Sequence, residues 1–211
     1  MTDHSTSETN LPDLDTDVLI VGAGPVGMTL ALALAGSPLK ITLIDKRARG
    51  AWCEDPRALA LSHGSRQLLE RIEAWNASAA TDIREIHVSQ RGGFGRTLLN
   101  CADYSTPALG YVMRYRDLAS SLDRQIPATQ LIGESHIGAI EASHDTIGIT
   151  HARQGRSQRI QAKLVVHAEG TPDDDPAVKQ FDYRQQAIVA DVRPCPAHGH
   201  RAWERFTPDG P

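Results

Sequence analysis

The stretch TDVLIVGAGPVGMTLALALAG, residues 16–36, decides the fold. Val18–Val21 is a short, wholly apolar run rich in β-branched residues, which predicts a parallel strand buried on both faces. Met28–Ala35 is an unbroken apolar run, which predicts a helix buried on all sides. Three glycines lie between these runs, so the stretch predicts a strand, a tight turn and a helix in succession.

The three glycines, Gly22, Gly24 and Gly27, form a G-x-G-x-x-G pattern. In a strand–turn–helix setting, the first glycine permits the tight turn, the second lets the backbone approach a pyrophosphate, and the third lets the helix pack closely on the strand. The helix N-terminus adds free N–H groups and the positive end of a dipole. The pattern therefore predicts a dinucleotide site.

A second apolar strand is expected at Ile41–Ile44, and it ends in Asp45. An acid at about 20 residues from the glycines is placed to accept hydrogen bonds from the adenosine ribose hydroxyls. Because a carboxylate repels a phosphate on that ribose, NAD or FAD is favoured over NADP at this site.

The composition narrows the choice of partners. The 211 residues hold 22 Lys and Arg against 26 Asp and Glu, a net charge of −4, and no basic run, so nucleic acid is not expected as a partner. Cys53, Cys101 and Cys195 lack the spacing of a disulfide framework or a zinc site, and we predict no metal site. No apolar run reaches the roughly 20 residues of a bilayer-spanning helix.

The chain after Asp45 departs from an ordinary nicotinamide-binding domain. Ser62 is expected to cap a helix that carries Leu68, Leu69 and Ile72, and the glycines at 92, 93 and 95 predict a hairpin turn after an alternating strand at 86–89. This departure disfavours an NAD-dependent dehydrogenase.

The second half of the chain is predicted to be rich in strands. A strand and then a helix with Leu118 and Leu122 on one face precede an alternating region, 131–166, that predicts a β-meander returning to the main sheet. Two further strands are expected, separated by a turn at Pro194 and Pro196.

Several segments together resemble the FAD-dependent aromatic hydroxylases, and within them the 2-polyprenyl-6-methoxyphenol hydroxylase branch of ubiquinone biosynthesis. The resemblance covers essentially everything from Asp17 to Pro211. Its segments are DVLIVGAGPVGMTLALALA, DPRALALSHGSRQLLERI, IHVSQRGGFGRT, ALGYVMRYRDLASSL, DYRQQAIVADV and HRAWERFTPDGP, of which IHVSQRGGFGRT and AWERFTPDGP are the most discriminating.

The resemblance implies an α/β protein with a glutathione-reductase-like FAD-binding fold, a Rossmann-type parallel sheet with a β-meander, interleaved with part of a mixed-sheet substrate domain. The boundaries it implies are a disordered leader at 1–15, an FAD-binding domain at 16–175 with an inserted hairpin at about 83–112 on the substrate side, and the start of the substrate domain at 176–211. The C-terminal half of the family pattern is expected to be absent.

The resemblance also implies a chemistry and a set of contacts. FAD and NAD(P)H would serve to put one oxygen atom of O₂ onto a polyprenylated phenol, and no catalytic side chain is assigned. Gly22, Gly24 and Gly27 would line the FAD pyrophosphate and Asp45 would hold the adenosine ribose. Arg57 and Arg114 would reach the cofactor, Arg57 near the flavin. A cytoplasmic location is expected, while peripheral contact with the inner membrane and assembly with other ubiquinone-biosynthesis proteins stay open.

Two departures from the family keep a second hypothesis open. The segment AEGTPDDD carries Asp173 where the family has serine, beside Asp174 and Asp175, and the chain stops at Pro211 before the family's later FAD-binding motifs. The alternative is a truncated, catalytically inactive module that binds flavin or a partner.

Four local features have two interpretations each. His63 and His87 are assigned no role, and His198 and His200 fit a solvated loop better than a metal site. Trp203 and Phe206 would either line a prenyl-phenol pocket or belong to a core. Arg91–Gly95 fits a hairpin turn better than a phosphate cradle.

Overall fold

The computed structural model describes residues 14–170, 179, 181, 183–208 and 210, and these fall into two compact units. The first unit is made from the described residues up to 56, from 72–75 and from 115 onward to 170. The second unit is made from 57–71, 76–114 and the described residues after 178. The two units are thus interleaved along the chain.

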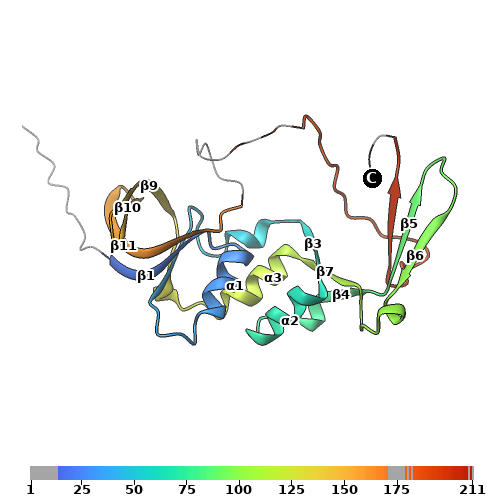
Figure 1. The fold of residues 1–211 in the computed structure, drawn as a ribbon, viewed down its shortest axis with the longest axis horizontal. Coiled ribbons are helices and arrows are strands. Elements are labelled where there is room, and N and C mark those ends of the chain that lie inside the picture. Colours follow the sequence, from blue (N-terminus) through green and yellow to red (C-terminus); the bar gives the residue numbers. More distant parts are fainter. Residues whose placement is uncertain (1–13, 171–178, 180, 182, 209, 211) are drawn as a thin grey trace, which may run out of the picture. The chain divides into compact units, whose positions relative to one another are not determined.

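The first unit is built on a six-stranded sheet of order β8-β2-β1-β11-β10-β9 (Figure 1). Its elements are β1 (Leu14–Val21), α1 (Pro25–Ala33), β2 (Ile41–Ile44), α3 (Tyr115–Asp123), β8 (Leu131–Ile132), β9 (Ser135–Ala142), β10 (Ile147–Arg153) and β11 (Arg156–His167). β1 runs parallel to β2 and β11, β2 runs parallel to β8, and β9, β10 and β11 form an antiparallel meander. The predicted parallel sheet with a returning meander is confirmed.

The core of the first unit follows from the alternation of side chains along β1. Leu19 and Val21 join a buried cluster with Ile149 and Ile160 of the meander. Ile20, on the other face of the strand, lies under α1 next to Gly27. Because both faces are covered, all four residues of Val18–Val21 are buried, as their apolar sequence predicts.

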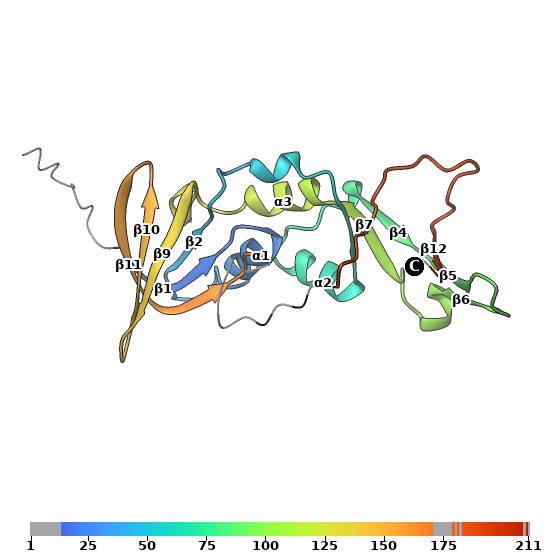
Figure 2. The same cartoon turned by 90° about the horizontal axis from the view of Figure 1, so that it is seen from above.

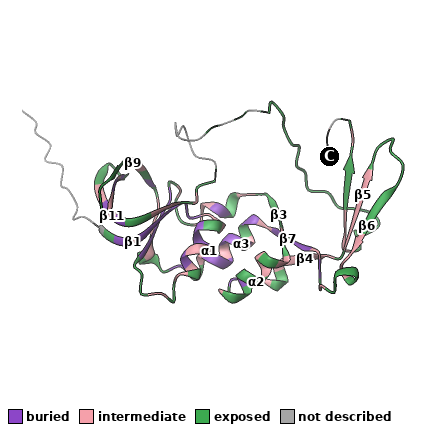
Figure 3. Ribbon diagram, in the orientation of Figure 1, coloured by how far each residue is buried: buried purple, intermediate pink, exposed green. Residues whose placement is uncertain are grey.

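The prediction of a helix buried on all sides is wrong for the described residues. α1 buries only Gly27, Met28 and Ala31, while Val26 is 72% exposed, and Figure 3 shows the mixed burial of this helix. A helix that covers one face of a sheet needs one apolar stripe, and no described residue covers the opposite stripe of α1. The sequence of α1 is apolar on every face of the helix, but only one face is buried.

The second unit holds two three-stranded sheets and one helix. Its elements are β3 (Ala58–Leu61), α2 (His63–Arg71), β4 (Ala80–Ile83), β5 (Glu85–Gln90), β6 (Arg96–Asn100), β7 (Gly110–Arg114) and β12 (Arg201–Phe206). One sheet has the order β3-β7-β4, and the other has the order β12-β5-β6, with β5 and β6 as an antiparallel hairpin (Figure 2).

Several of the smaller sequence predictions, in both units, are confirmed. Ser62 caps α2, since its Oγ accepts a hydrogen bond of 3.0 Å from the N–H of Ser65. The glycines at 92, 93 and 95 lie in the turn of the β5–β6 hairpin, and Leu118 and Leu122 face the core from α3.

One predicted strand is absent from the described residues. Two strands were expected around Pro194 and Pro196, but only β12 forms, and Ile188 and Val189 in the preceding segment are exposed. An apolar run such as the one from Ala187 to Ala190 forms a strand only where a neighbouring strand supplies hydrogen bonds, and no described strand pairs with this segment. The predicted leader up to residue 13 and the acidic run Asp173–Asp175 lie outside the described residues.

Candidate functional site

The turn between β1 and α1, residues Gly22–Gly27, is here called the glycine turn. Gly22 has a φ of +102°, and a side chain there would place its Cβ 2.7 Å from the backbone of Ala168 and Glu169. Its N–H donates to the carbonyl of Ile44 at 2.8 Å. Only glycine meets both the backbone conformation and the close approach, so Gly22 is required by the fold itself.

Gly27 is also required by the fold. A Cβ at this position would overlap the carbonyl oxygen of Gly22, and it would press on the Cγ2 of Ile20 at 3.2 Å. The first turn of α1 can therefore lie against the end of β1 only when residue 27 has no side chain.

Gly24 differs from both of these glycines. Its backbone is extended, with a φ of −78° and a ψ of −179°, which any residue adopts. A Cβ there would meet only the hydroxyl of Tyr115 at 3.4 Å. Because neither conformation nor protein packing demands glycine here, the position is free for a ligand to approach the backbone closely.

The same residue is the N-cap of α1, and the start of this helix is open to an anion. No side chain caps it, no acid lies in its first turn, and Pro25 stands in the first turn, where a missing N–H is of no consequence. The free N–H groups and the helix dipole favour negative charge at this point. Gly24 and the start of α1 together fit a pyrophosphate.

Asp45 follows directly on β2 and reaches back to the glycine turn. Asp45 is only 8% exposed, and its Oδ2 accepts a hydrogen bond of 2.8 Å from the N–H of Ala23. The backbone N–H of Arg47 donates to Oδ1 at 2.8 Å, and the Arg47 guanidinium contacts both oxygens at 3.1 and 3.2 Å. The structure thus brings together Gly22, Gly24, Gly27 and Asp45.

The protonation of Asp45 is set by opposing influences. Burial is the largest single influence and raises the pKa of the carboxyl group. The hydrogen bonds from Arg47 and from the N–H of Ala23, with the charge of Arg47, outweigh it, so the pKa lies below its ordinary value of 3.8. The carboxylate is therefore ionised at neutral pH and ready to accept hydroxyl hydrogen bonds.

Arg47 and Tyr115 are members of the site that the sequence prediction missed. The Arg47 side chain is hydrogen-bonded to the Tyr115 hydroxyl as well as to Asp45, and the pKa of Arg47 is raised chiefly by its hydrogen bond with Asp45. Tyr115 is buried beside Gly24. The signal for Arg47 is its place two residues after the acid, whereas Tyr115 is far away in sequence and nothing local marks it.

The two arginines predicted to reach the cofactor belong to the second unit. Arg57 immediately precedes β3, and Arg114 ends β7, where it pairs with Ala58 in the antiparallel ladder. Arg114 forms an ion pair of 2.7 Å with Asp191. The structure therefore places the two arginines near each other, and their contact with a cofactor stays a prediction.

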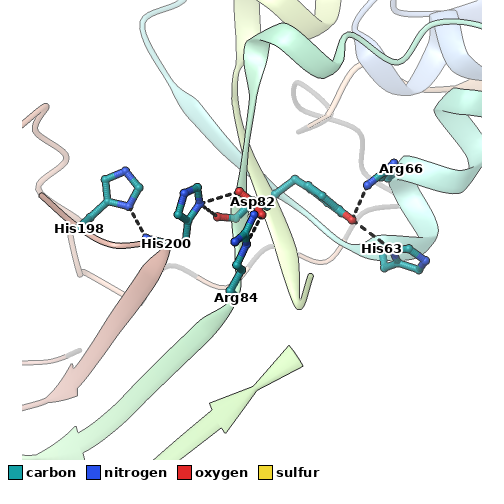
Figure 4. A network of polar contacts seen from close by, with 7 residues as sticks. His63, Arg66, Asp82, Arg84, His198 and His200 are labelled. Carbon is teal, nitrogen blue, oxygen red and sulfur yellow. Dashed lines mark hydrogen bonds and ion pairs between the residues drawn. The ribbon is translucent and has the colours of Figure 1, made fainter. Parts of the chain in front are cut away.

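A polar network links the strands and the helix of the second unit (Figure 4). Asp82 contacts the Nδ1 of His200 and the Nε of Arg84 at 2.6 Å each, while His198 accepts a hydrogen bond from the N–H of His200 at 3.0 Å. The pKa of Asp82 is lowered, chiefly by its hydrogen bond with Arg84. Within the described ranges no three His, Cys, Asp or Glu side chains are grouped as metal ligands.

Tyr111 of β7 is paired with Asp82 of β4 in the antiparallel ladder, and its side chain makes a second set of polar contacts. The Tyr111 hydroxyl accepts a hydrogen bond of 2.8 Å from Arg66 and lies 3.4 Å from the Nδ1 of His63. Since α2 supplies His63 and Arg66 and β7 supplies Tyr111, these contacts fix the helix on its sheet (Figure 4).

Trp203 and Phe206 do not belong to a core in the described chain. Trp203 is 64% exposed and stacks on His87 with ring centroids 4.6 Å apart, and Phe206 at the end of β12 is also exposed. The pocket interpretation of the two residues stays a prediction.

Comparison with known families agrees with this geometry. Residues 15–173 match the family described as FAD binding domain. The 3-demethoxyubiquinol 3-hydroxylase of Escherichia coli is 27% identical over 96% of this chain and 54% of its own length. The ubiquinone hydroxylase UbiL of Rhodospirillum rubrum is 30% identical over 96% of this chain and 49% of its own length. The chain spans about half the length of these relatives.

Solved structures show the same fold. The p-nitrophenol 4-monooxygenase PnpA of Pseudomonas putida superposes with a TM-score of 0.62 at 16% identity, covering 75% of this chain and 42% of PnpA. The substrate-free rebeccamycin biosynthetic enzyme RebC superposes with a TM-score of 0.58 at 24% identity, covering 76% of this chain and 34% of RebC. In the part of the chain that the structure describes, no helix has the length and apolarity needed to span a membrane.

Proposed function

The chain belongs to the FAD-binding domain family, and we propose that it supplies the FAD-binding part of a monooxygenase that hydroxylates a polyprenylated phenol in ubiquinone biosynthesis. Two relatives are hydroxylases of ubiquinone or demethoxyubiquinol by name, and this supports the substrate class. The single observation that carries the cofactor assignment is Gly24, a glycine that the protein's own packing does not demand, at the open start of α1.

In this proposal, different residues of the site hold different parts of the dinucleotide or orient the residues that do. The backbone at Gly24 and the start of α1 bind the pyrophosphate, and Asp45 accepts hydrogen bonds from the adenosine ribose. Ala23 and Arg47 orient the Asp45 carboxylate and keep it ionised. Arg57 contacts the cofactor near the flavin, and Arg114 is a second proposed contact with the cofactor.

Bound FAD, reduced by NAD(P)H, supplies the oxygen-transfer chemistry. The chain's own task is then to bind the cofactor, to fix its adenosine end and to leave the ring end free to meet a phenol. Asp45 does not need to exchange a proton in this role, since its lowered pKa holds it as a carboxylate at neutral pH.

A titration of the purified chain with FAD, FMN and NAD tests the cofactor assignment. We expect FAD to bind and FMN to bind at least tenfold more weakly, because FMN lacks the adenosine end that Asp45 and the glycine turn recognise. A visible flavin spectrum that is lost in Gly24→Val supports the site. Tight binding of NAD without any flavin would instead favour a dehydrogenase.

The reaction is tested separately, once flavin binding is established. We expect oxidation of NADH or NADPH that depends on a polyprenylated phenol and on O₂, with one oxygen atom incorporated into the product. Flavin binding without such turnover would leave the chain as a flavin-binding module and overturn the proposal of activity.

A further inference from the structure

The turn of the β5–β6 hairpin exposes an aromatic residue between two arginines. Its sequence is Arg91-Gly92-Gly93-Phe94-Gly95-Arg96, and we call these six residues the tip. Phe94 is fully exposed, and Gly92 and Gly95 have φ values of +73° and +93°, with no atom within 4 Å of the place that a Cβ would take. The Gln90 side chain lies against Gly93, but Phe94 itself is fully exposed, so the apolar side chain of the tip is presented to the surroundings.

Three arginines, Arg91, Arg96 and Arg205, lie at the end of the sheet that carries Phe94. Arg96 shares a row of the sheet with Ser89 and Arg205, so Arg96 and Arg205 lie on one face, and the backbone N–H of Arg91 donates to the carbonyl of Phe206 at 2.8 Å. Among the described residues, none forms an ion pair with these three guanidinium groups. Several other arginines of this unit, such as Arg84 and Arg201, are paired with acids.

The charges near the tip are of one sign on this face. Glu204 is the acid adjacent to Arg205 in sequence, and the alternation of the strand directs it to the opposite face. Two rows further from the tip, Trp203, His87 and Leu98 are aligned on the same face as Arg96, and both Trp203 and Leu98 are exposed. Figure 2 shows the three strands of this sheet side by side.

We propose that the tip is a contact site for an anionic lipid bilayer. Phe94 enters the boundary between headgroups and acyl chains, while Arg91, Arg96 and Arg205 bind lipid phosphates. An apolar side chain surrounded by cations fits a surface that is apolar at depth and anionic at its rim, as such a bilayer is. Arg96 lies two residues from Phe94, about 7 Å of chain at most, which matches the roughly 5–10 Å depth of interfacial insertion.

Because the net charge of the chain is negative, only the region around the tip is attracted to an anionic bilayer. With a total of −4, the chain as a whole is repelled by an anionic surface, so binding depends on the tip and not on bulk charge. The contact needs no cofactor, and it goes beyond the proposed hydroxylase function because it concerns where the chain is held.

Co-sedimentation of the full 211-residue chain with vesicles tests the proposal. The vesicles are made of phosphatidylcholine alone or with about one quarter phosphatidylglycerol, at low and high salt. We expect binding to the anionic vesicles that salt weakens, and a loss of about tenfold or more in Phe94→Ser and in the triple variant R91Q/R96Q/R205Q. The melting temperature should not change in Phe94→Ser, since its side chain packs on nothing described.

The chain offers a matched control in a second hairpin turn. Arg153 and Arg156 face each other across the β10–β11 turn, where Gly155 has a φ of +74° and no aromatic residue is present. R153Q/R156Q and Tyr104→Ser, which changes another exposed aromatic residue, should bind vesicles like the unchanged chain. Absence of vesicle binding, equal binding to neutral vesicles, or an equal loss in the control variants overturns the proposal, and tip-dependent capture of an acidic protein in place of vesicles would do the same.

Discussion

The glycine turn and the tip each contain three glycines within six residues, but different forces select them. At Gly22 and Gly27 a side chain would collide with backbone atoms of the first unit. At Gly92 and Gly95 there is open space, and only a positive φ favours glycine. The comparison teaches that a glycine count alone says little, because crowded glycines hold a fold together while exposed glycines only shape a turn.

The largest effect is expected from Gly27→Ala. Its Cβ would overlap the Gly22 carbonyl, so α1 must leave the end of β1, and we expect a loss of more than about 4 kcal/mol in the free energy of unfolding. Soluble yield and thermal unfolding are the measurements. In the control Gly36→Ala, no atom lies within 4 Å of the added Cβ, so this variant should unfold like the unchanged chain. Equal stability of the two variants would contradict the requirement for glycine at residue 27.

Gly24→Ala separates binding from folding within the same turn. Its backbone is extended and only the Tyr115 hydroxyl is near, so the free energy of unfolding should fall by no more than about 1 kcal/mol, the usual difference between glycine and alanine at an N-cap. FAD binding should weaken by about 10- to 100-fold, because the added methyl group lies where a pyrophosphate approaches. A variant that unfolds but keeps its flavin affinity would contradict this assignment.

Asp45→Asn should lower stability by about 1–2 kcal/mol at neutral pH, since the Arg47 ion pair is lost but Arg47 remains partly solvated. The pH dependence has a definite sign. The pKa of Asp45 is lowered in the folded state, so its contribution is present above the ordinary value of 3.8 and is lost as the pH falls through the folded pKa. Urea unfolding from about pH 7 to about pH 3 should therefore show a smaller acid loss in the variant, and parallel curves would argue against an ionised, bonded Asp45.

The parts that sequence predicted well are those with local causes. Val18–Val21 is apolar because both faces of β1 are covered, and the glycine turn and Asp45 follow from spacing along one strand–helix–strand unit. Tyr115 was missed because it reaches Gly24 from a helix about 90 residues away, and such contacts leave no local pattern. The expected strand near Ile188 was wrong, because an apolar run forms a strand only where a neighbouring strand pairs with it.

The smallest effect is expected from Gly92→Asn, at the tip. Asparagine tolerates positive φ better than other residues with a side chain, and no neighbouring atom opposes its Cβ, so the free energy of unfolding should change by about 0.5 kcal/mol or less. Gly92→Val is the sharper partner: a β-branched residue resists this φ, and a loss of about 1–2 kcal/mol is expected from backbone strain alone. No atom lies within 4 Å of the place that a Cβ at residue 92 would take. A difference in unfolding free energy between the two variants therefore measures the cost of the backbone conformation and not a packing effect. Equal unfolding free energies for the two would show that the tip adapts its backbone, in which case its glycines are not needed for the turn and the presentation of Phe94 does not depend on them.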